Sequence, residues 1–275
     1  MRTRWRYIED DGSSASFGLA ADEYIARKVC TSTSTSTSTS TFTHVVRLYT
    51  YKDASVMLGR NQDVESEINL PCCAELGIDI NRRPTGGGAI VMGKGQLGVA
   101  IAGPVTGRSV LLDSKTTFSP FTRAIIVGLS LLGIKSEFRP KNDIYVKDGK
   151  IAGLATYTLD DNGTSAALYH ASILADIDKD LMLRLLKKPG KKNAGKNAGK
   201  NAENNDGAIT TVSSELGRHV GTSELRGYIK RGIEKVLDAE LVPEPFSQAE
   251  LREIKRLEQV KYSSDSWIYY GKEQP

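Results

Sequence analysis

The 275-residue chain carries 37 basic and 33 acidic side chains, and 39% of its residues are apolar. This size is enough to bury one large core, and the net charge of +4 is too small to favour nucleic acid as a partner. The three cysteines lack framework spacing, and neither a secretory signal nor a membrane-length apolar run is present, which predicts a soluble, cytoplasmic protein with reduced thiols and no membrane contact.

The N-terminal part predicts alternating helices and strands. In chain order we expect a helix over 16–29, strands at 45–51 and 55–59 joined by a turn at Lys52 and Asp53, and a helix over 70–76 ended by Gly77, after which residues 79–81 lead into Arg82 and Arg83. The alternating Thr and Ser residues at 31–41 offer no apolar face. They are therefore expected to form an exposed loop.

Residues 82–91, with the sequence RRPTGGGAIV, are the most informative part of the chain. Arg82 and Arg83 stand shortly before Gly86, Gly87 and Gly88. Glycines leave backbone N–H groups open to close approach by a ligand, and guanidinium groups suit carboxylate or phosphate oxygens. This segment is therefore predicted to bind an acyl or phosphoryl anion.

A second glycine motif, at 93–98, satisfies the G-x-G-x-x-G pattern of dinucleotide-binding proteins. That pattern requires a helix after it, whereas here a strand-like run follows and stops at Gly103-Pro104. We therefore interpret the motif as the turn of a hairpin. The Gly-Lys-Ser/Thr tripeptide of P-loops and the H-R-D and D-F-G motifs of protein kinases are missing, which excludes both classes.

The C-terminal part adds strands first and helices afterwards. We expect a helix over 119–132, strands at 144–146 and 151–157 around a turn at 147–149, a strand over 167–175, and helices over 224–237 and 247–260. The Lys-, Asn- and Gly-rich stretch at 187–207 cannot offset its ordering entropy by burial, so a surface loop is favoured over a contact with nucleic acid or an acidic partner. Adjoining strands and helices in blocks predict one α+β domain over 1–275, with a mostly antiparallel central sheet flanked by helices.

Five motifs, in a fixed order, resemble those of lipoate-protein ligase A. They are Gly59-Arg60-Asn61-Gln62, the segment 82–88, Lys141-Asn142-Asp143-Ile144, Gly149-Lys150-Ile151-Ala152-Gly153 and His170-Ala171-Ser172-Ile173-Leu174. The resemblance covers roughly residues 15–270 and implies the biotin/lipoate protein ligase catalytic domain fold. It also implies activation of lipoate by ATP and Mg²⁺ to lipoyl-AMP, and transfer of the lipoyl group to a lysine of a carrier. Such carriers are the acyltransferase subunit of 2-oxoacid dehydrogenases, the glycine cleavage H-protein or a related lipoate-binding protein.

The resemblance assigns roles to individual residues. Lys150 would be the catalytic residue, stabilising charge on the α-phosphate and the acyl oxygens. Asn142 and Asp143 would orient the adenylate, and Asp143 is a candidate Mg²⁺ ligand. The other expected substrate- and adenylate-binding residues are Arg82, Arg83, Thr85, Gly86, Gly87, Gly88, Gly153 and His170. His170 stands in an apolar run, so a purely structural role is as good an explanation for it as a substrate contact. For the acidic pair Asp22-Glu23, which matches a pair on the first helix of the family, capping or a solvated face is an equally good explanation.

The chain departs from the family pattern in three ways. Met92-Gly93 stands where the family has His-Asp, and Gly98 where it has Asn or a similar residue. These changes predict altered nucleotide or acyl positioning and a divergent branch with its own carrier. The chain also stops where the catalytic domain of the family ends, so we expect no C-terminal accessory domain and a separate small subunit that completes a split ligase.

Two other functions are considered beside the ligase. An octanoyltransferase of the same fold passes the acyl group through a cysteine thioester, which would require Cys72 or Cys73 to fold back into the pocket. A non-catalytic lipoate- or acyl-binding regulator would fit the altered residues Met92 and Gly93, although Lys150 argues against it. Biotin ligation is less favoured because biotin ligases carry a differently spaced Gly-Arg-Gly-Arg motif.

Overall fold

The computed structural model describes residues 2–34, 42–105, 119–139, 142–161, 163–187 and 208–273. The strands are β1 (Thr3–Ser13), β2 (Val45–Tyr51), β3 (Ser55–Leu58), β4 (Asp79–Arg82), β5 (Ile90–Met92), β6 (Gln96–Pro104), β7 (Glu137–Arg139), β8 (Asp143–Val146), β9 (Gly149–Asp161), β10 (Thr164–Leu174) and β11 (Ala239–Pro243). The helices are α1 (Ala15–Ser34), α2 (Val64–Glu67), α3 (Leu70–Leu76), α4 (Pro120–Leu131), α5 (Lys179–Leu185), α6 (Val212–Leu216), α7 (Thr222–Leu237), α8 (Gln248–Leu257), the π-helical turn η1 (Glu258–Tyr262) and α9 (Asp265–Tyr270). None of these helices is long and apolar enough to cross a membrane, among the residues that the structure describes.

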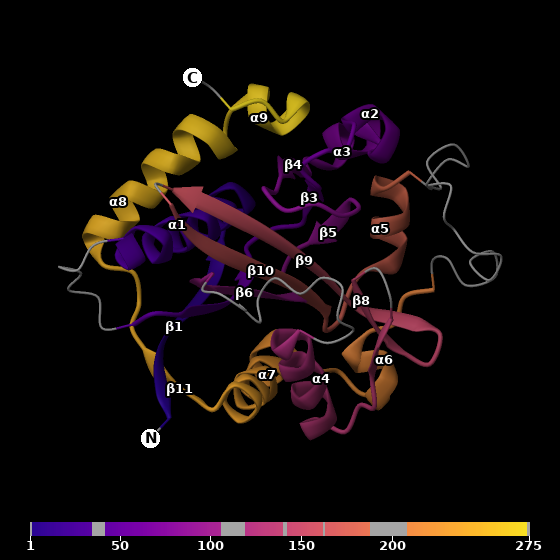
Figure 1. Ribbon diagram of the computed structural model, residues 1–275. Coiled ribbons are helices and arrows are strands. Elements are labelled where there is room, and N and C mark those ends of the chain that lie inside the picture. Colours follow the sequence, from indigo (N-terminus) through magenta and orange to yellow (C-terminus); the bar gives the residue numbers. More distant parts are fainter. Residues whose placement is uncertain are drawn as a thin grey trace.

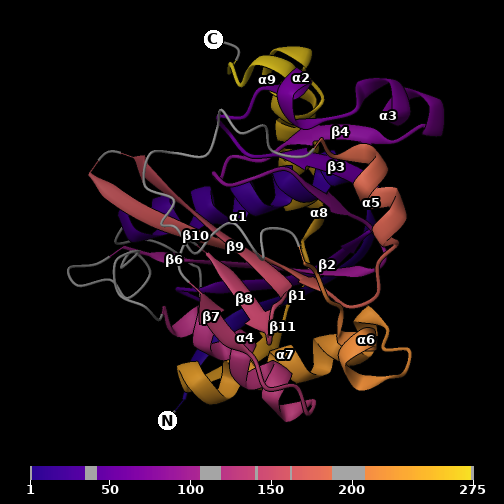
Figure 2. The ribbon, with the colours of Figure 1, turned by 90° about the vertical axis from the view of Figure 1, so that its right-hand side faces the viewer.

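A large sheet with the strand order β11-β1-β2-β6-β10-β9-β8-β7 forms the centre of the molecule. β1 lies parallel to both β11 and β2, and the other neighbouring strands are antiparallel. Helices α4 and α7 pack on one face of the sheet, and α1 and α8 lie on the other (Figures 1 and 2). The predicted α+β fold with a mostly antiparallel sheet is confirmed.

The two faces of this sheet carry side chains of different size. Along β6, Leu97, Val99 and Ile101 join the core under α4 and α7, whereas the alternate residues Ala100 and Ala102 face α1. Successive side chains of a strand point to opposite faces, so this alternation leaves one bulky face and one face of small residues. Because these residues are small, the face of the sheet toward α1 has space for a cavity beside the helix.

A small sheet with the order β4-β3-β5 packs against α2, α3 and α5. The chain crosses to it after β2 and returns before β6. The two crossings touch at Gly93, where a Cβ atom would lie 3.2 Å from the Cα atom of Ala54. The hairpin predicted around 93–98 is wrong, because β5 pairs with β3 while β6 pairs with β2 and β10. The glycines of the segment allow the sharp turn, but they do not determine which sheet each strand joins.

Several elements differ from the sequence-based expectations. Helix α1 continues through Ser34, and the hydroxyl of Thr31 donates to the carbonyls of Arg27 and Lys28, so a loop beginning at 31 is wrong. The expected loops at 35–41 and 188–207 lie outside the described residues. β1 was not expected, because its acidic residues obscure the apolar alternation of Trp5 and Tyr7. The hairpin at 147–149 is confirmed, with Lys147 in a left-handed conformation at φ 51°.

Candidate active site

A cavity of about 230 Å³ lies between the large and the small sheet. Its walls come from β3 and β5, the glycine loop at 86–88, β8 to β10, α1 and α5. Most of the lining side chains are apolar, including Leu19, Tyr49, Met57, Met92, Leu174 and Met182. The polar side chains among them include Arg83, Asn142, Asp143, Lys150 and His170. An apolar bed with a few polar groups suits an acid with an apolar tail.

The floor of the cavity is one row of residues across five strands. Tyr49 pairs with Gly98, Gly98 with Ser172, Ser172 with Gly153, and Gly153 with Asp143. Residues paired in this way face the same side of the sheet, and each strand adds about 4.8 Å. The three middle residues are small, and the Tyr49 ring covers Gly98, where a Cβ atom would come within 2.4 Å of it. The floor therefore runs from a polar end at Asp143 to an aromatic end at Tyr49.

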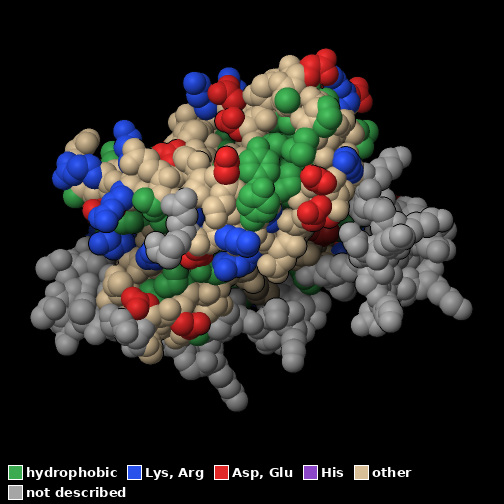
Figure 3. Space-filling view, turned by 90° about the horizontal axis from the view of Figure 1, so that it is seen from above, with side chains coloured by type: hydrophobic (Ala, Val, Ile, Leu, Met, Phe, Trp, Pro, Cys, Tyr) green, Lys and Arg blue, Asp and Glu red, His purple; other side chains and the backbone are tan. Residues whose placement is uncertain are grey.

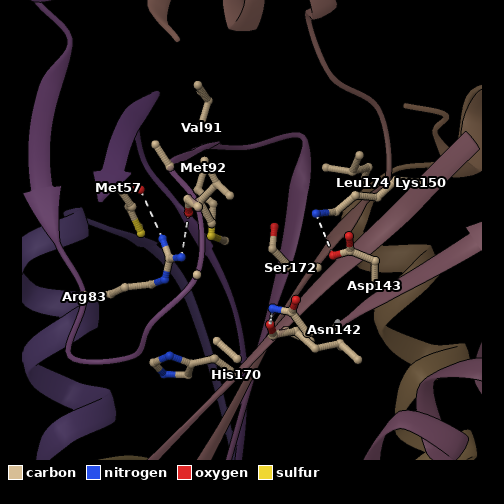
Figure 4. A pocket seen from close by; sticks show the side chains of 18 of the residues that line it. Met57, Arg83, Val91, Met92, Asn142, Asp143, Lys150, His170, Ser172 and Leu174 are labelled. Carbon is tan, nitrogen blue, oxygen red and sulfur yellow. Dashed lines mark hydrogen bonds and ion pairs between the residues drawn. The ribbon is translucent and has the colours of Figure 1, made fainter. Parts of the chain in front are cut away.

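Lys150 reaches the polar end through a bulge in β9. The pairing with β8 shifts by one residue after Ile144, which places Lys150 on the same side as Gly153. Its Nζ atom lies 2.7 Å from Oδ1 of Asp143, and the side chain is 32% exposed (Figure 4). A Cβ atom at position 153 would lie 3.3 Å from Nζ, so Gly153 gives the ammonium group its space. The predicted neighbours Lys150, Asp143 and Gly153 are thus brought together.

The backbone of Lys150 is also fixed by a segment far along the chain. Its N–H donates to the carbonyl of Ala208 at 2.9 Å, and its carbonyl accepts from the N–H of Thr210 at 3.0 Å. Gly149 permits this approach, since a Cβ atom there would lie 2.8 Å from Thr210. Ile209, between these two residues, lines the cavity.

Asn142 and the glycine loop face each other across the cavity. The Nδ2 group of Asn142 donates to the carbonyl of Leu154 and lies 3.8 Å from the position of a Cβ atom at Gly87. Gly87 has a φ of 96°, which other residues rarely adopt. Gly87 and Gly88 line the cavity, as predicted.

Arg83 lies at the cavity wall with its guanidinium group buried (Figure 4). Nη1 donates to the carbonyl of Met57 at 3.1 Å, and Nη2 donates to those of Gly86 and Gly88 at 2.9 and 2.7 Å. Burial lowers the pKa of Arg83 to about 10, so the group stays charged at neutral pH. Among the described residues no carboxylate pairs with it, and an anionic ligand nearby would offset the cost of burying this charge.

Arg82, Thr85 and Gly86 do not line the cavity, so the structure does not bring these three predicted residues to it, and their binding of substrate or adenylate stays a prediction. Neighbouring residues at the end of β4 point in opposite directions, so Arg83 faces the cavity and Arg82 faces away from it. The guanidinium group of Arg82 is buried, and all of its hydrogen bonds to residues that the structure describes go to backbone carbonyls. Thr85 is buried as well, and its carbonyl accepts from the N–H of Arg60.

His170 lines the cavity and lies beside a buried chain of charges. Its Nε2 atom is 2.9 Å from Oδ2 of Asp22, without the alignment of a hydrogen bond. Oδ1 of Asp22 lies 2.6 Å from Arg47, which also pairs with Asp10 at 2.6 Å. Burial would raise the pKa of Asp22, but the charges of Arg47 and His170 outweigh burial and lower it. His170 is thus both a lining residue and part of a structural network.

Both residues of the acidic pair on α1, Asp22 and Glu23, are buried. Glu23 pairs with Lys261 at 2.8 Å and with Arg27 at 2.5 Å, and it accepts a hydrogen bond from Tyr262. Neither carboxylate of the pair Asp22-Glu23 caps a helix or faces solvent, so both of those interpretations are wrong. The pair links α1 to β2 and to the C-terminal segment.

The three cysteines of the chain all lie away from the cavity. Cys72 and Cys73 are in α3 and pack into the core of the small sheet, where burial raises the pKa of Cys73. Cys30 is buried on α1, with Thr164 as a neighbour. No thiol of this chain therefore reaches the cavity in this structure.

The sequence did not indicate several lining residues. Leu19, Tyr49, Met57 and Met182 come from four different elements and read as ordinary core positions. Met92, which replaces the polar residue of the family pattern, forms part of the apolar wall. Met92 and Gly98 were noted in the sequence only as departures from the family pattern, and Gly98 is explained by the ring of Tyr49 that covers it.

Comparisons with known proteins agree with this geometry. The family model described as the lipoyl protein ligase A/B catalytic domain matches residues 14–234. The octanoyltransferase LipM of Bacillus subtilis is 24% identical over 98% of this chain and 99% of its own length. The lipoate-protein ligase LplJ of the same organism is 28% identical over 81% of this chain, but the match spans 63% of LplJ.

Solved structures show the same fold. A bi-partite lipoate protein ligase from Thermoplasma acidophilum superimposes with a TM-score of 0.79 at 24% identity, over 99% of both chains. Lipoate-protein ligase A bound with ATP gives a TM-score of 0.75 at 24% identity, over 98% of this chain and 99% of that one. With a family model that matches most of its length, this chain belongs to the lipoyl protein ligase A/B catalytic domain family.

Proposed function

We propose that this protein is an ATP-dependent lipoate-protein ligase that activates lipoate as lipoyl-AMP and transfers the lipoyl group to a lysine of a lipoyl-domain carrier protein. The observation that carries the proposal is a cavity with an apolar bed, two cationic side chains, Lys150 and Arg83, and no thiol. Lipoate has an apolar tail that fits the bed and a carboxylate that fits the cations.

The chemistry of adenylation requires such cations. A carboxylate oxygen of lipoate attacks the α-phosphorus of ATP, the bond to the β-phosphate oxygen breaks, and pyrophosphate leaves with the electron pair. Both reactants are anions, so a fixed cation is needed where they meet. Lys150 is the candidate, because its ammonium group is partly exposed beside the small floor residues. In the second half-reaction a carrier lysine attacks the anhydride carbonyl, and AMP leaves.

Asp143 fits a supporting role in this reaction. Its carboxylate holds the ammonium group of Lys150 at 2.7 Å and has a second oxygen left for other contacts. Mg²⁺ is usually held by one or two carboxylates together with substrate phosphates, so Asp143 would be the protein ligand of a nucleotide-bound ion. Such an ion supplies charge neutralisation on the phosphates.

An octanoyltransferase is the second candidate, because LipM is similar over nearly the whole chain. That activity would proceed without ATP through a thioester on a cysteine, with release of the thiol of the acyl carrier. Cys72 and Cys73 face the core of the small sheet, and the pKa of Cys73 is raised, whereas a nucleophilic thiol needs a lowered one. The position of the thiols supports the ligase.

The decisive assay mixes the purified protein with lipoate, Mg-ATP and a lipoyl-domain acceptor. It is run with and without a candidate small subunit, because the similar Thermoplasma protein is described as bi-partite. We expect lipoate-dependent AMP release and lipoylated acceptor, with a loss of at least about 100-fold in Lys150→Ala. Acyl transfer from octanoyl carrier protein without ATP would instead support the octanoyltransferase. Lipoate binding without either reaction would identify a regulator.

A further inference from the structure

Arg82 joins the C-terminal helix α9 to the loop at 59–62. Its guanidinium group donates to carbonyls on both sides, namely those of Trp267, Ile268 and Tyr269 on α9 and those of Gly59, Arg60 and Gln62 on the loop, at 2.7 to 3.1 Å. The three carbonyls of α9 lie in the last turn of the helix, where carbonyls carry partial negative charge, and that of Trp267 also accepts from the N–H of Gly271. Arg82 therefore acts as the cap of α9 from another part of the chain.

Helix α9 also donates a hydrogen bond to Arg82. The Nε1–H group of Trp267 donates to the carbonyl of Arg82 at 2.8 Å, and Trp267 is fully buried. Gly271, just after the helix, has a φ of 64°, and a Cβ atom there would lie 3.2 Å from the carbonyl oxygen of Arg60. Side chain and backbone thus fix α9 against the same loop.

This loop in turn supports the glycine loop of the cavity. A Cβ atom on Gly59 would lie 2.1 Å from the carbonyl oxygen of Gly87, so the two backbones are in direct contact. The N–H of Arg60 donates to the carbonyl of Thr85 at 2.9 Å. Arg83 holds the carbonyls of Gly86 and Gly88 from the cavity side. Arg83 therefore holds the glycine loop directly, whereas Arg82 holds the loop at 59–62 against which the glycine loop packs.

We propose that Arg82 is a positioning residue for the glycine loop, and that α9 acts on the acid-binding cavity through it. The chemical identity of the acid rests on the proposed function, whereas the mechanical link does not. A guanidinium group offers five donors in a fixed plane, which matches several carbonyls at once, whereas an ammonium group offers three from one point. Lysine at position 82 would keep the charge and lose part of the link.

The outer side of α9 is open to solvent. Tyr269 is 40% exposed and Tyr270 is 73% exposed. Figure 3 views the molecule from above Figure 1, the side on which α9 lies, and hydrophobic side chains gather there among acidic and basic ones. Tyr270 therefore offers a control position on the same helix that does not touch Arg82.

The test compares Arg82→Lys and Trp267→Phe with Tyr270→Ala by amide hydrogen exchange without substrate. We expect the amides of Arg60 and Gln62, which donate to the carbonyls of Thr85 and Gly59, to exchange about tenfold faster in Arg82→Lys, and less strongly so in Trp267→Phe, while amides of β6 and β10 stay unchanged. In lipoate-dependent AMP release, the KM for lipoate should rise about tenfold in Arg82→Lys, with kcat within about threefold of the parent protein. Tyr270→Ala should match the parent in both measurements.

Two outcomes would overturn the inference. Equal acceleration of exchange throughout the protein would mean that Arg82 only stabilises the fold, and unchanged exchange of the Arg60 amide in both Arg82→Lys and Trp267→Phe would mean that no link exists. Trp267→Phe retains an aromatic ring but removes the Nε1–H donor to Arg82, and it tests the link even if Arg82→Lys fails to fold. If the parent protein shows no ligase activity while the exchange results hold, the proposed function fails and the positioning role of Arg82 stands.

Discussion

The ring of Tyr49 lies directly against Gly98, where a Cβ atom would come within 2.4 Å of it. A side chain at position 98 would push the ring into the cavity, so we expect Gly98→Ala to weaken lipoate binding at least about tenfold. Titration calorimetry measures this change. Gly227→Ala is the matched control, because a Cβ atom there meets open space. Unchanged affinity in Gly98→Ala would show that the ring does not border the acid.

The pair formed by Lys150 and Asp143 leads to a second prediction. Asp143→Asn keeps the shape of the side chain but removes the charge that holds the ammonium group, so we expect kcat for AMP release to fall about 10- to 100-fold. The Mg²⁺ concentration needed for half-maximal rate should rise as well. Thermal stability should change little, because a partly exposed pair contributes little to folding.

Asp148→Asn is the control for that experiment. Asp148 lies in the turn of the same hairpin, is exposed, and pairs only loosely with Arg139 at 3.7 Å. It should leave both kcat and the Mg²⁺ requirement unchanged. An equal loss in both variants would indicate damage to the hairpin and would contradict a role for Asp143 in the chemistry.

The cysteines give a third prediction. Because Cys30, Cys72 and Cys73 all lie away from the cavity, a variant with all three replaced by Ala should keep lipoate-dependent AMP release within about threefold. Thiol-blocking reagents should likewise not inhibit the native protein. Loss of acyl transfer in a folded Cys-free variant, rescued by restoring one cysteine, would point to thioester catalysis.

Sequence analysis located those site residues whose position is set by their immediate neighbours. It did not locate those whose position depends on elements far apart in the chain. Gly87, Gly88, Asn142 and Lys150 lie together because each sits at a strand end or a tight turn that its own neighbours specify. Arg82 was expected beside Arg83 at the cavity but faces away from it, and its partners on α9, 185 residues along the chain, cannot be recognised from the local sequence. Tyr49 carried no signal, since an aromatic residue in a strand is a normal core residue.

The buried carboxylates of Asp22 and Glu23 give the last prediction. Burial would raise both pKa values, but Arg47 and His170 outweigh it for Asp22, as Lys261 does for Glu23, and both values are lowered. The unfolded values are about 3.9 and 4.3, so the stabilisation is fully present above about pH 5 and is lost as pH falls through the lowered folded values. The free energy of unfolding, measured with urea, should therefore fall below about pH 4, in addition to a loss below about pH 6.5 from His44, whose pKa is lowered by burial.

The variant Asp22→Asn separates the contribution of Asp22 to this pH dependence from acid unfolding caused by other groups. The variant leaves the fully buried Arg47 with one carboxylate instead of two, so we expect a loss of about 3 kcal/mol at pH 7. The difference from the native protein should narrow below about pH 4, because Asp22 is protonated in the unfolded chain before it is protonated in the folded one. Asp176→Asn removes an exposed pair with His219 at 2.7 Å and should change stability little. A difference for Asp22→Asn that stays constant from pH 7 to 3 would show that the Asp22 carboxylate does not stabilise the fold through its charge.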